Sequence, residues 1–548
     1  MRPDTSQRRG KAVSRNQATK TALVSAAALV GSALFVSRIL GFFRNSVIAA
    51  LFGQNNITDA YNTAYLFPDT LYLILIGGAV SSAFIPVIAR YIHEQQEDEA
   101  WRVVSIAFSV TLVGMSAIIL LGLIFAPVFV KLIAPGLGPA KFAFTVMLTR
   151  ITILAILFHS LNGVLIGTEF SYNTFLATSI GPLVYNTTII VMGVTLAPRL
   201  GIVAFAWATV VGAFLNFLIQ LWGTWRLKPK FTWSLDIRHP GVRRIGRLML
   251  PVMIGLSIAQ INLLFNQIFL ASLLPGGTIN ALVISSRIML VPILVATSIG
   301  IALLPSLTRE AVRQDHDAFR GLFTEAMRAV FFVSIPASVA LIILAHPLIR
   351  ILFQHGAFTD EATTVTAGAL LFYSIGIVGY GTYEIISRAF FAMEDTTTPL
   401  KTGLVSVGIG LVLNLILIRL FSFRGLALAF SLTGFLNAGI LLWALRRRMG
   451  RLGGLRLWDA TWRTSLATLA MAAVLLTGGL AIAHNVVIGP PIVADLIQLL
   501  VPIAIGMTAF VAVARWLKMP ELSLVFGIVR RRLRPGHARA TADQGGPQ

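Results

Sequence analysis

Fourteen apolar stretches follow one another along this chain, and each is long enough to cross a lipid bilayer as a helix. Hydrophobic residues make up 56% of the 548 and charged residues only 12%, a balance that excludes a soluble globular protein. The sequence therefore predicts an all-α polytopic membrane protein with 14 transmembrane helices. These spans cover residues 22–52, 59–90, 103–130, 142–167, 174–196, 201–225, 247–274, 278–308, 321–345, 362–387, 396–418, 425–445, 460–483 and 493–516.

The positions of Lys and Arg predict the orientation. Most of the net charge of +22 lies in the two tails and in every second loop, on the side that holds both ends. Because loops rich in Lys and Arg stay in the cytoplasm, we expect both termini there. The basic segments suit anionic lipid headgroups, and no nucleic-acid partner is expected. A cleaved signal peptide is disfavoured, because the apolar run continues well past Ala33.

Two echoes in the sequence indicate an internal repeat. "AFIPVIAR" at 83–90 returns as "ALLPSLTR" at 302–309, and "FLNFLIQLW" at 214–222 returns as "FLNAGILLW" at 435–443, each about 220 residues later. Six spans per copy make this a parallel repeat of two six-helix bundles, an arrangement typical of secondary transporters. The predicted organisation is a basic tail (1–20), a first bundle (21–227), a basic linker (228–246), a second bundle (247–448), two further helices (449–517) and a basic tail (518–548).

Arginines inside the predicted spans are the candidate functional residues. Arg38 and Arg44 lie in "SRILGFFRNSVIAALFG" at 37–53, and Arg287 lies near the middle of the eighth span. An arginine at the centre of a span costs at least about 2.5–3.5 kcal/mol on insertion, so it normally faces a partner or a water-filled cavity. Six residues separate Arg38 from Arg44, and a bend at Gly41 would bring both to one cavity. An excess of guanidinium groups suits phosphate.

Acidic residues in the spans leave a structural alternative open. Asp59 and Asp69 could neutralise the first-span arginines, whereas Arg150, a secondary candidate, has no obvious acidic partner in its own helix. Glu384 and Arg388 have the i, i+4 spacing of an ion pair, which we interpret as structural.

Other chemistry is sparse in this sequence. The chain has no Cys, its eight His residues show no metal-ligand spacing, and it contains no phosphate-binding G-x-x-x-x-G-K-[ST] loop. We therefore predict no enzyme activity, no metal and no cofactor.

Several motifs resemble those of the MurJ/MviN family of the MOP transporter superfamily. They are the 37–53 segment, "TDAYNTAYLFP", "GGAVSSAFIPVIARY", "LLPSLT", "LFQHGAFT" and "FFAMEDTTTPLKTG". The resemblance implies a fourteen-span flippase in the bacterial cytoplasmic (inner) membrane that carries lipid II, the undecaprenyl-pyrophosphate-linked peptidoglycan precursor, to the outer leaflet. It further implies two bundles around a cationic cavity and a lipid-tail groove at the last two helices. Cell-wall synthesis proteins are further candidate partners.

The family's functional positions fall on residues that the charge pattern had already singled out. The resemblance implies substrate-binding roles for Arg38, Arg44, Asp59 and Arg287, with Asp69 and Arg150 as secondary candidates. The chain departs from many relatives, which carry charges where it has Tyr72, Gly77 and Leu290. Spans 7, 11 and 12 contain no Asp or Glu, which argues against the sodium site that some relatives place there.

Other functions remain open from the sequence. The alternatives are a flippase for another undecaprenyl-pyrophosphate-linked oligosaccharide, a drug exporter, a membrane glycosyltransferase and a non-transporting scaffold that binds the lipid carrier. Cationic drugs would call for acidic groups in the cavity, and a glycosyltransferase would call for a sizeable extramembrane loop bearing a catalytic carboxylate or histidine. Neither feature stands out in the sequence.

Overall fold

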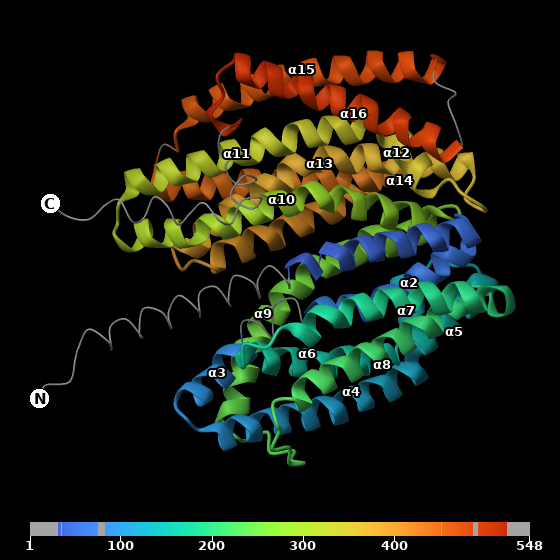
Figure 1. Ribbon diagram of the computed structural model, residues 1–548, viewed down its shortest axis with the longest axis vertical. Coiled ribbons are helices and arrows are strands. Elements are labelled where there is room, and N and C mark those ends of the chain that lie inside the picture. Colours follow the sequence, from blue (N-terminus) through green and yellow to red (C-terminus); the bar gives the residue numbers. More distant parts are fainter. Residues whose placement is uncertain (1–30, 34, 75–82, 451, 486–490, 523–548) are drawn as a thin grey trace, which may run out of the picture. The chain divides into compact units, whose positions relative to one another are not determined.

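The computed structural model describes residues 31–522 except 34, 75–82, 451 and 486–490, and within this part of the chain it contains helices and no strand (Figure 1). The first helix spans Gly31–Phe52. The following helices are α2 (Asn56–Ile74), α3 (Ile85–His93), α4 (Glu97–Ile133), α5 (Pro139–Thr152), α6 (Ala155–Ser171), α7 (Leu176–Leu200), α8 (Val203–Trp225), α9 (Pro240–Leu264), the short η2 (Phe265–Leu270) and η3 (Ala271–Leu273), α10 (Thr278–Val312), α11 (His316–Ile343), α12 (Ala345–Phe353), α13 (Asp360–Ala392), α14 (Thr397–Met449), α15 (Gly454–Asn485) and α16 (Pro491–Trp516).

Ten helices of the described residues are long and apolar enough to cross a membrane. This confirms the all-α membrane class, whereas the number of fourteen spans stays a prediction. Some of these ten candidate spans combine neighbouring helices. α5 and α6 are counted as one span, Pro139–Ser171, and α14 is counted as one although it covers two of the predicted spans. Large apolar side chains of α4 point outward, which suits contact with lipid tails. They are Leu120, Leu121, Ile124, Phe125 and Val128.

The long α14 is two helices joined at a tight break. Ser422 has φ 54° and ψ −134°, outside the helical region, between the predicted spans at 396–418 and 425–445. A Cβ on Gly425 would lie 2.0 Å from the carbonyl oxygen of Leu417, so only glycine fits there. The two predicted spans therefore correspond to two helical segments that continue without a loop.

The chain forms two compact units, the first comprising Met1–Asn280 with His355–Phe358. Within it α7 packs along α8, α8 along α6, and α2 against α5. Its core is made of small and aromatic side chains, among them Tyr61, Tyr65 and Phe205. The sequence placed residues 247–274 in the second bundle, but α9 packs against α2, α3 and α4 in the first unit. The repeat-based domain boundaries stay a prediction.

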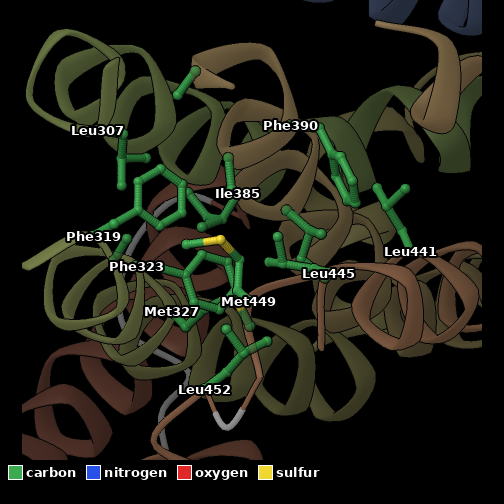
Figure 2. Packing of buried hydrophobic residues seen from close by; sticks show 14 of the residues in the cluster. Leu307, Phe319, Phe323, Met327, Ile385, Phe390, Leu441, Leu445, Met449 and Leu452 are labelled. Carbon is green, nitrogen blue, oxygen red and sulfur yellow. The ribbon is translucent and has the colours of Figure 1, made fainter. Parts of the chain in front are cut away.

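The second unit comprises Ala281–Gln354 and Thr359–Gln548. One core of this unit lies where α10, α11, α13 and α14 meet. Figure 2 shows Phe319 and Phe323 beside Met327 and Met449 in this core, and Phe390 beside Leu441. Removing these apolar side chains from solvent stabilises the unit. The helices α15 and α16 pack on α11 through a separate cluster that includes Phe332, Met471 and Phe510.

Candidate functional site

A cavity of about 220 Å³ lies inside the first unit. The first helix, α2, α6, α7 and α8 each contribute to its wall. Its lining is polar and partly cationic, although every wall helix is largely apolar in sequence. The lining residues are Ser37, Arg38, Arg44, Tyr65, Asp69, His159, Pro182, Tyr185, Asn186 and Asn216.

Arg44 is the most deeply placed charge in the cavity, with 5% of its surface exposed. Its Nη1 donates to the hydroxyl oxygen of Tyr65 at 3.0 Å and to Oδ1 of Asn186 at 3.4 Å. The guanidinium carbon also lies 4.9 Å from the centre of the Tyr65 ring, within cation–π range. Among the described residues its Nε has no hydrogen-bond partner. The buried guanidinium is therefore held by neutral groups and retains donor capacity for a ligand.

Further hydrogen bonds fix the residues that hold Arg44. The Nδ2 of Asn186 donates to Oγ of Ser37 at 3.1 Å, and Ser37 lies two helical turns before Arg44 on the same face. The hydroxyl oxygens of Tyr65 and Tyr185 lie 3.1 Å apart. Since Asn186 belongs to α7 and Tyr65 to α2, side chains of three helices determine the position of one guanidinium.

Arg38 lines the same cavity from a different direction. Its side chain is exposed, in contrast to that of Arg44, as the six-residue spacing on one helix predicts. The backbone stays α-helical through Gly41, so both arginines reach the cavity without a break in the helix. Asp69 of α2 completes the charged part of the lining and is half-buried.

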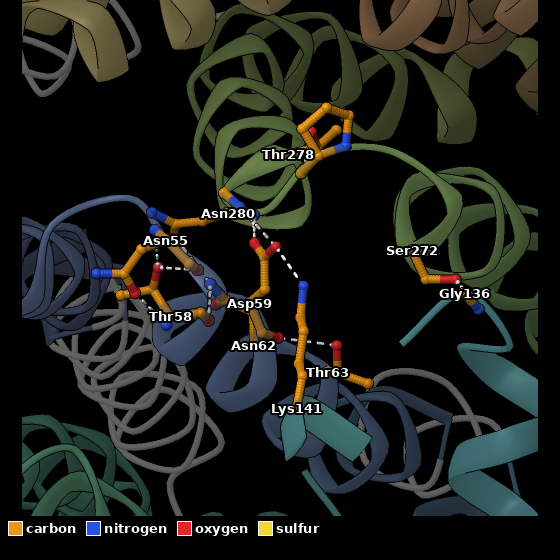
Figure 3. A network of polar contacts seen from close by, with 12 residues as sticks. Asn55, Thr58, Asp59, Asn62, Thr63, Gly136, Lys141, Ser272, Thr278 and Asn280 are labelled. Carbon is orange, nitrogen blue, oxygen red and sulfur yellow. Dashed lines mark hydrogen bonds and ion pairs between the residues drawn. The ribbon is translucent and has the colours of Figure 1, made fainter. Parts of the chain in front are cut away.

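Asp59 lies outside this cavity, in a buried network shown in Figure 3. Its Oδ2 accepts from Nζ of Lys141 and from the backbone N–H of Gly277, at 2.9 and 2.7 Å, and its Oδ1 accepts from the N–H of Asn280 at 2.9 Å. The carboxylate thus pairs with a lysine and caps the first residues of α10. The alternative in which Asp59 neutralises Arg38 or Arg44 is wrong, because Lys141 is its partner.

The remaining predicted arginines, Arg150 and Arg287, are not among the residues that line this cavity. Arg150 of α5 is exposed, and its Nε donates to the carbonyl oxygen of Leu123 at 3.0 Å. Arg287 lies on α10 in the second unit and is half-buried. Its predicted role opposite the first-span arginines stays a prediction.

The structure also describes the predicted ion pair on α13 and one of the positions where the chain departs from its relatives. The predicted pair of Glu384 and Arg388 on α13 is confirmed, with an N–O distance of 3.7 Å. Of the positions where the chain departs from relatives, Leu290 is exposed on α10. Gly77 lies outside the described residues, as does the side chain of Tyr72.

Sequence reasoning missed the neutral half of the site. Tyr65, Tyr185, Asn186 and Asn216 were not candidates, because single polar residues in apolar spans are common and carry no charge. Lys141 was counted only as a loop charge. A useful signal would have been the two asparagines, since an amide inside a span needs a hydrogen-bond partner.

The cavity combines two guanidinium groups with one carboxyl group, Asp69, so its charged groups carry an excess of positive charge that suits an anion. Two guanidinium groups face one cavity, and the groups around Arg44 are neutral hydroxyls and amides that orient it without consuming its charge. In the part of the chain that the structure describes, no three His, Cys, Asp or Glu side chains are grouped as metal ligands.

Comparison with solved structures identifies the class. A structure titled "Lipid II flippase MurJ, inward closed conformation" is 26% identical, with a TM-score of 0.75, and the match covers 89% of this chain and 99% of that one. A multidrug resistance MATE family transporter of the MOP superfamily, 15% identical, shares the fold with a TM-score of 0.66 over 76% of this chain and 95% of its own. Fold and cavity together define a multi-pass membrane transporter.

The family follows from the sequence comparisons. The family model described as lipid II flippase MurJ matches residues 48–494. A Burkholderia cenocepacia protein named lipid II flippase MurJ is 31% identical over 452 residues, which are 81% of this chain and 86% of that protein. The chain belongs to the MurJ family, a family of flippases and not of enzymes, and it is a multi-pass inner-membrane protein.

Proposed function

We propose that this chain is a flippase that moves lipid II from the inner to the outer leaflet of the cytoplasmic membrane. The observation that carries the proposal is the pair Arg38 and Arg44 lining one cavity in a chain of the MurJ family. Lipid II has a pyrophosphate as its charged centre, and guanidinium groups recognise phosphate oxygens through paired hydrogen bonds.

All of the predicted site residues except Arg150 have a role in this proposal. Arg44 binds a phosphate oxygen with its remaining donors, Arg38 attracts the anion from the exposed side, and Asp69 limits the positive charge of the empty cavity. Arg287 binds the pyrophosphate from the second half of the protein. Asp59 supports the site from outside the cavity, whereas Arg150 takes no part.

The transport cycle that we propose is alternating access between two halves. The cavity opens to one side of the membrane at a time, so the pyrophosphate crosses while bound to arginine and never enters lipid unpaired. The prenyl tail stays in lipid beside α15 and α16, the two helices that follow the repeat. Both termini lie in the cytoplasm in this scheme.

Two alternatives keep the same cavity chemistry. Another undecaprenyl-pyrophosphate-linked oligosaccharide would present the same charged group to Arg38 and Arg44. A non-transporting scaffold would bind the lipid carrier and recruit cell-wall synthesis proteins. The other flippase would differ from our proposal in its cargo, and the scaffold would not move any lipid. A transport assay with a lipid of known structure therefore distinguishes the three functions.

Purified protein in liposomes with labelled lipid II tests the proposal. We expect the wild type to move the label between leaflets without changing it chemically. Arg44→Ala and Arg287→Ala should each weaken lipid II binding roughly 10- to 150-fold, because a hydrogen bond to a charged group contributes about 1.5–3 kcal/mol. Arg44→Lys should recover only part of the loss.

Arg150→Ala is the matched control, since Arg150 is exposed and lies outside the cavity. It should bind and flip as the wild type does. If the protein moves a different prenyl-linked oligosaccharide and not lipid II, the proposed cargo is wrong. Binding of lipid II without movement between leaflets would favour the scaffold. An equal loss of lipid II binding in Arg150→Ala and Arg44→Ala would show that the cavity is not the binding site.

A further inference from the structure

A buried carboxyl group in the first unit has no part in the cationic cavity. Glu169, near the end of α6, has 1% of its surface exposed. It accepts hydrogen bonds from Oγ1 of Thr178 on α7 at 2.7 Å and from Oγ1 of Thr224 on α8 at 3.4 Å. A Cβ on Gly223 would lie 2.4 Å from its Oε1, so the backbone of α8 lies directly against the carboxyl.

Both groups that bind the Glu169 carboxyl are neutral hydroxyls, and among the described residues it makes no ion pair. Several ionisable groups on and around α6 have contacts other than Glu169: Arg90 with Glu94, Arg102 with Glu99, Lys141 with Asp59, Arg150 with the Leu123 carbonyl, Arg226 with the Trp222 ring, and Tyr172 near Glu97. Asp69, His159 and Tyr185 line the arginine cavity. A carboxylate buried without a cation is costly, whereas a protonated carboxyl with hydroxyl partners is not.

A row of polar side chains joins Glu169 to the arginine cavity along α8. Asn216, Gln220 and Thr224 are one turn apart and all buried, and we call them the polar ladder. Nε2 of Gln220 donates to Oδ1 of Asn216 at 3.2 Å, and Thr224 contacts Glu169. Asn216 itself lines the cavity. Eight residues of helix separate its two ends, a distance of about 12 Å.

Unused hydrogen-bonding capacity lies along the same route. Oε1 of Gln220 is buried without a hydrogen-bond partner among the described residues, and so are both amide atoms of Asn162. Asn162 is on α6, two turns before Glu169 and on the same face of the helix. Buried polar groups of this kind are where proteins hold internal water, which can carry a proton.

We propose that Glu169 is a proton-binding site, and that its protonation is coupled to anion binding in the arginine cavity. The carboxylate takes one proton from water and becomes a neutral carboxylic acid. Ionised Glu169 places a negative charge about 12 Å from the cavity, so it opposes a bound pyrophosphate. At an effective dielectric constant of about 20, two charges at that distance change an equilibrium constant roughly tenfold. Protonation and anion binding therefore favour each other.

Infrared spectroscopy of the purified full-length protein in lipid tests the proton site without any substrate. We expect a carbonyl band of a protonated carboxyl that appears on acidification and is absent from Glu169→Gln. Glu521→Gln is the matched control, because Glu521 is also buried but pairs with Arg328 at 2.6 Å, whereas Glu169 has no cationic partner among the described residues. Thr178→Val, which removes one donor, should shift the band. A band that Glu169→Gln retains, or that Thr178→Val leaves unshifted, would overturn the assignment.

Lipid II binding as a function of pH tests the coupling, which rests on the proposed function. We expect wild-type affinity to rise roughly tenfold as Glu169 becomes protonated. Glu169→Gln should bind lipid II at every pH with the affinity that the wild type has at acidic pH, so its affinity should not rise on acidification. Parallel pH curves for the two proteins would overturn the coupling. If neither protein binds lipid II at any pH, the proposed function fails while the infrared result still decides the proton site.

Discussion

At the scale of single residues, the sequence identifies the arginines inside spans as candidates by their charge alone. Their surroundings in the structure show that they have different roles. Arg44 is buried among hydroxyl and amide groups, whereas Arg328 of α11 is paired with Glu521. Both lie inside predicted spans and look alike in the sequence. A guanidinium held by neutral groups keeps its charge for a ligand, and one held by a carboxylate does not.

Asp59 gives the prediction at this scale. Removing its carboxylate would leave the ammonium group of Lys141, 12% exposed, without its partner, so Asp59→Ala should lower the free energy of unfolding by about 3 kcal/mol. The double variant Asp59→Asn with Lys141→Met removes both charges and should recover much of that loss. Thermal unfolding of the purified proteins measures both effects.

The same variants bear on the predicted substrate-binding role of Asp59. If Asp59 acts only as a structural partner, the double variant should bind lipid II nearly as well as the wild type. A double variant that is stable but does not bind would indicate a direct contact with the substrate. Wild-type stability in Asp59→Ala would contradict the structural role.

At the scale of elements, a polar cap orders the junction between α13 and α14. Asp395 accepts hydrogen bonds from the N–H groups of Thr397 and Thr398, at 3.1 and 2.9 Å, and it pairs with Arg448. Partial burial acts to raise the pKa of Asp395, but the N–H and hydroxyl of Thr398 and the guanidinium of Arg448 outweigh it. The pKa of this carboxyl is lowered below its ordinary value of 3.8.

This lowered pKa predicts how the stability of the second unit depends on pH. Because the folded protein favours ionised Asp395, the cap stabilises fully above the ordinary pKa near 3.8 and is lost as pH falls through the lower folded value. Asp395→Asn keeps an acceptor for these N–H groups but removes the negative charge, so it should cost about 0.3–1 kcal/mol at pH 7, the usual contribution of a carboxylate near a helix N-terminus. The difference from wild type should shrink below pH 3.8.

Thermal unfolding of both proteins at neutral and acidic pH measures this difference. Thr364→Ala on the exposed surface of α13 is a suitable control, because its hydroxyl bonds only within its own helix. A stability gap between wild type and Asp395→Asn that stays constant down to the most acidic pH would contradict the role of the ionised carboxylate.

At the scale of the whole molecule, the distribution of Lys and Arg predicts that both ends lie in the cytoplasm. A reporter fused after Gln548 should then be active on the inside, and one inserted near Asn485, between the last two helices, on the outside. The reverse result, or the same side for both, would contradict the predicted topology and the even number of spans.

Hydropathy in the sequence was enough to predict the membrane class and most helices. The predicted span at 103–130 lies inside α4, and that at 201–225 nearly coincides with α8. Such predictions succeed because a span must satisfy its backbone hydrogen bonds within one helix, whatever its neighbours are. The sequence also placed the break inside α14, because Ser422 lies between the predicted spans at 396–418 and 425–445.

The sequence by itself determined that Arg38 and Arg44 need an unusual environment, because an arginine inside a span is costly unless it meets a partner or water. Only the tertiary structure decided what that environment is. Asn186 lies 142 residues from Arg44, and Lys141 lies 82 residues from Asp59. Contacts over such separations depend on which helix faces pack together. A helix that is apolar on all sides has no sequence pattern that shows which face packs against a neighbour. For the same reason Glu169, an ordinary acid at the end of a span, became a candidate site only when three helices closed around it.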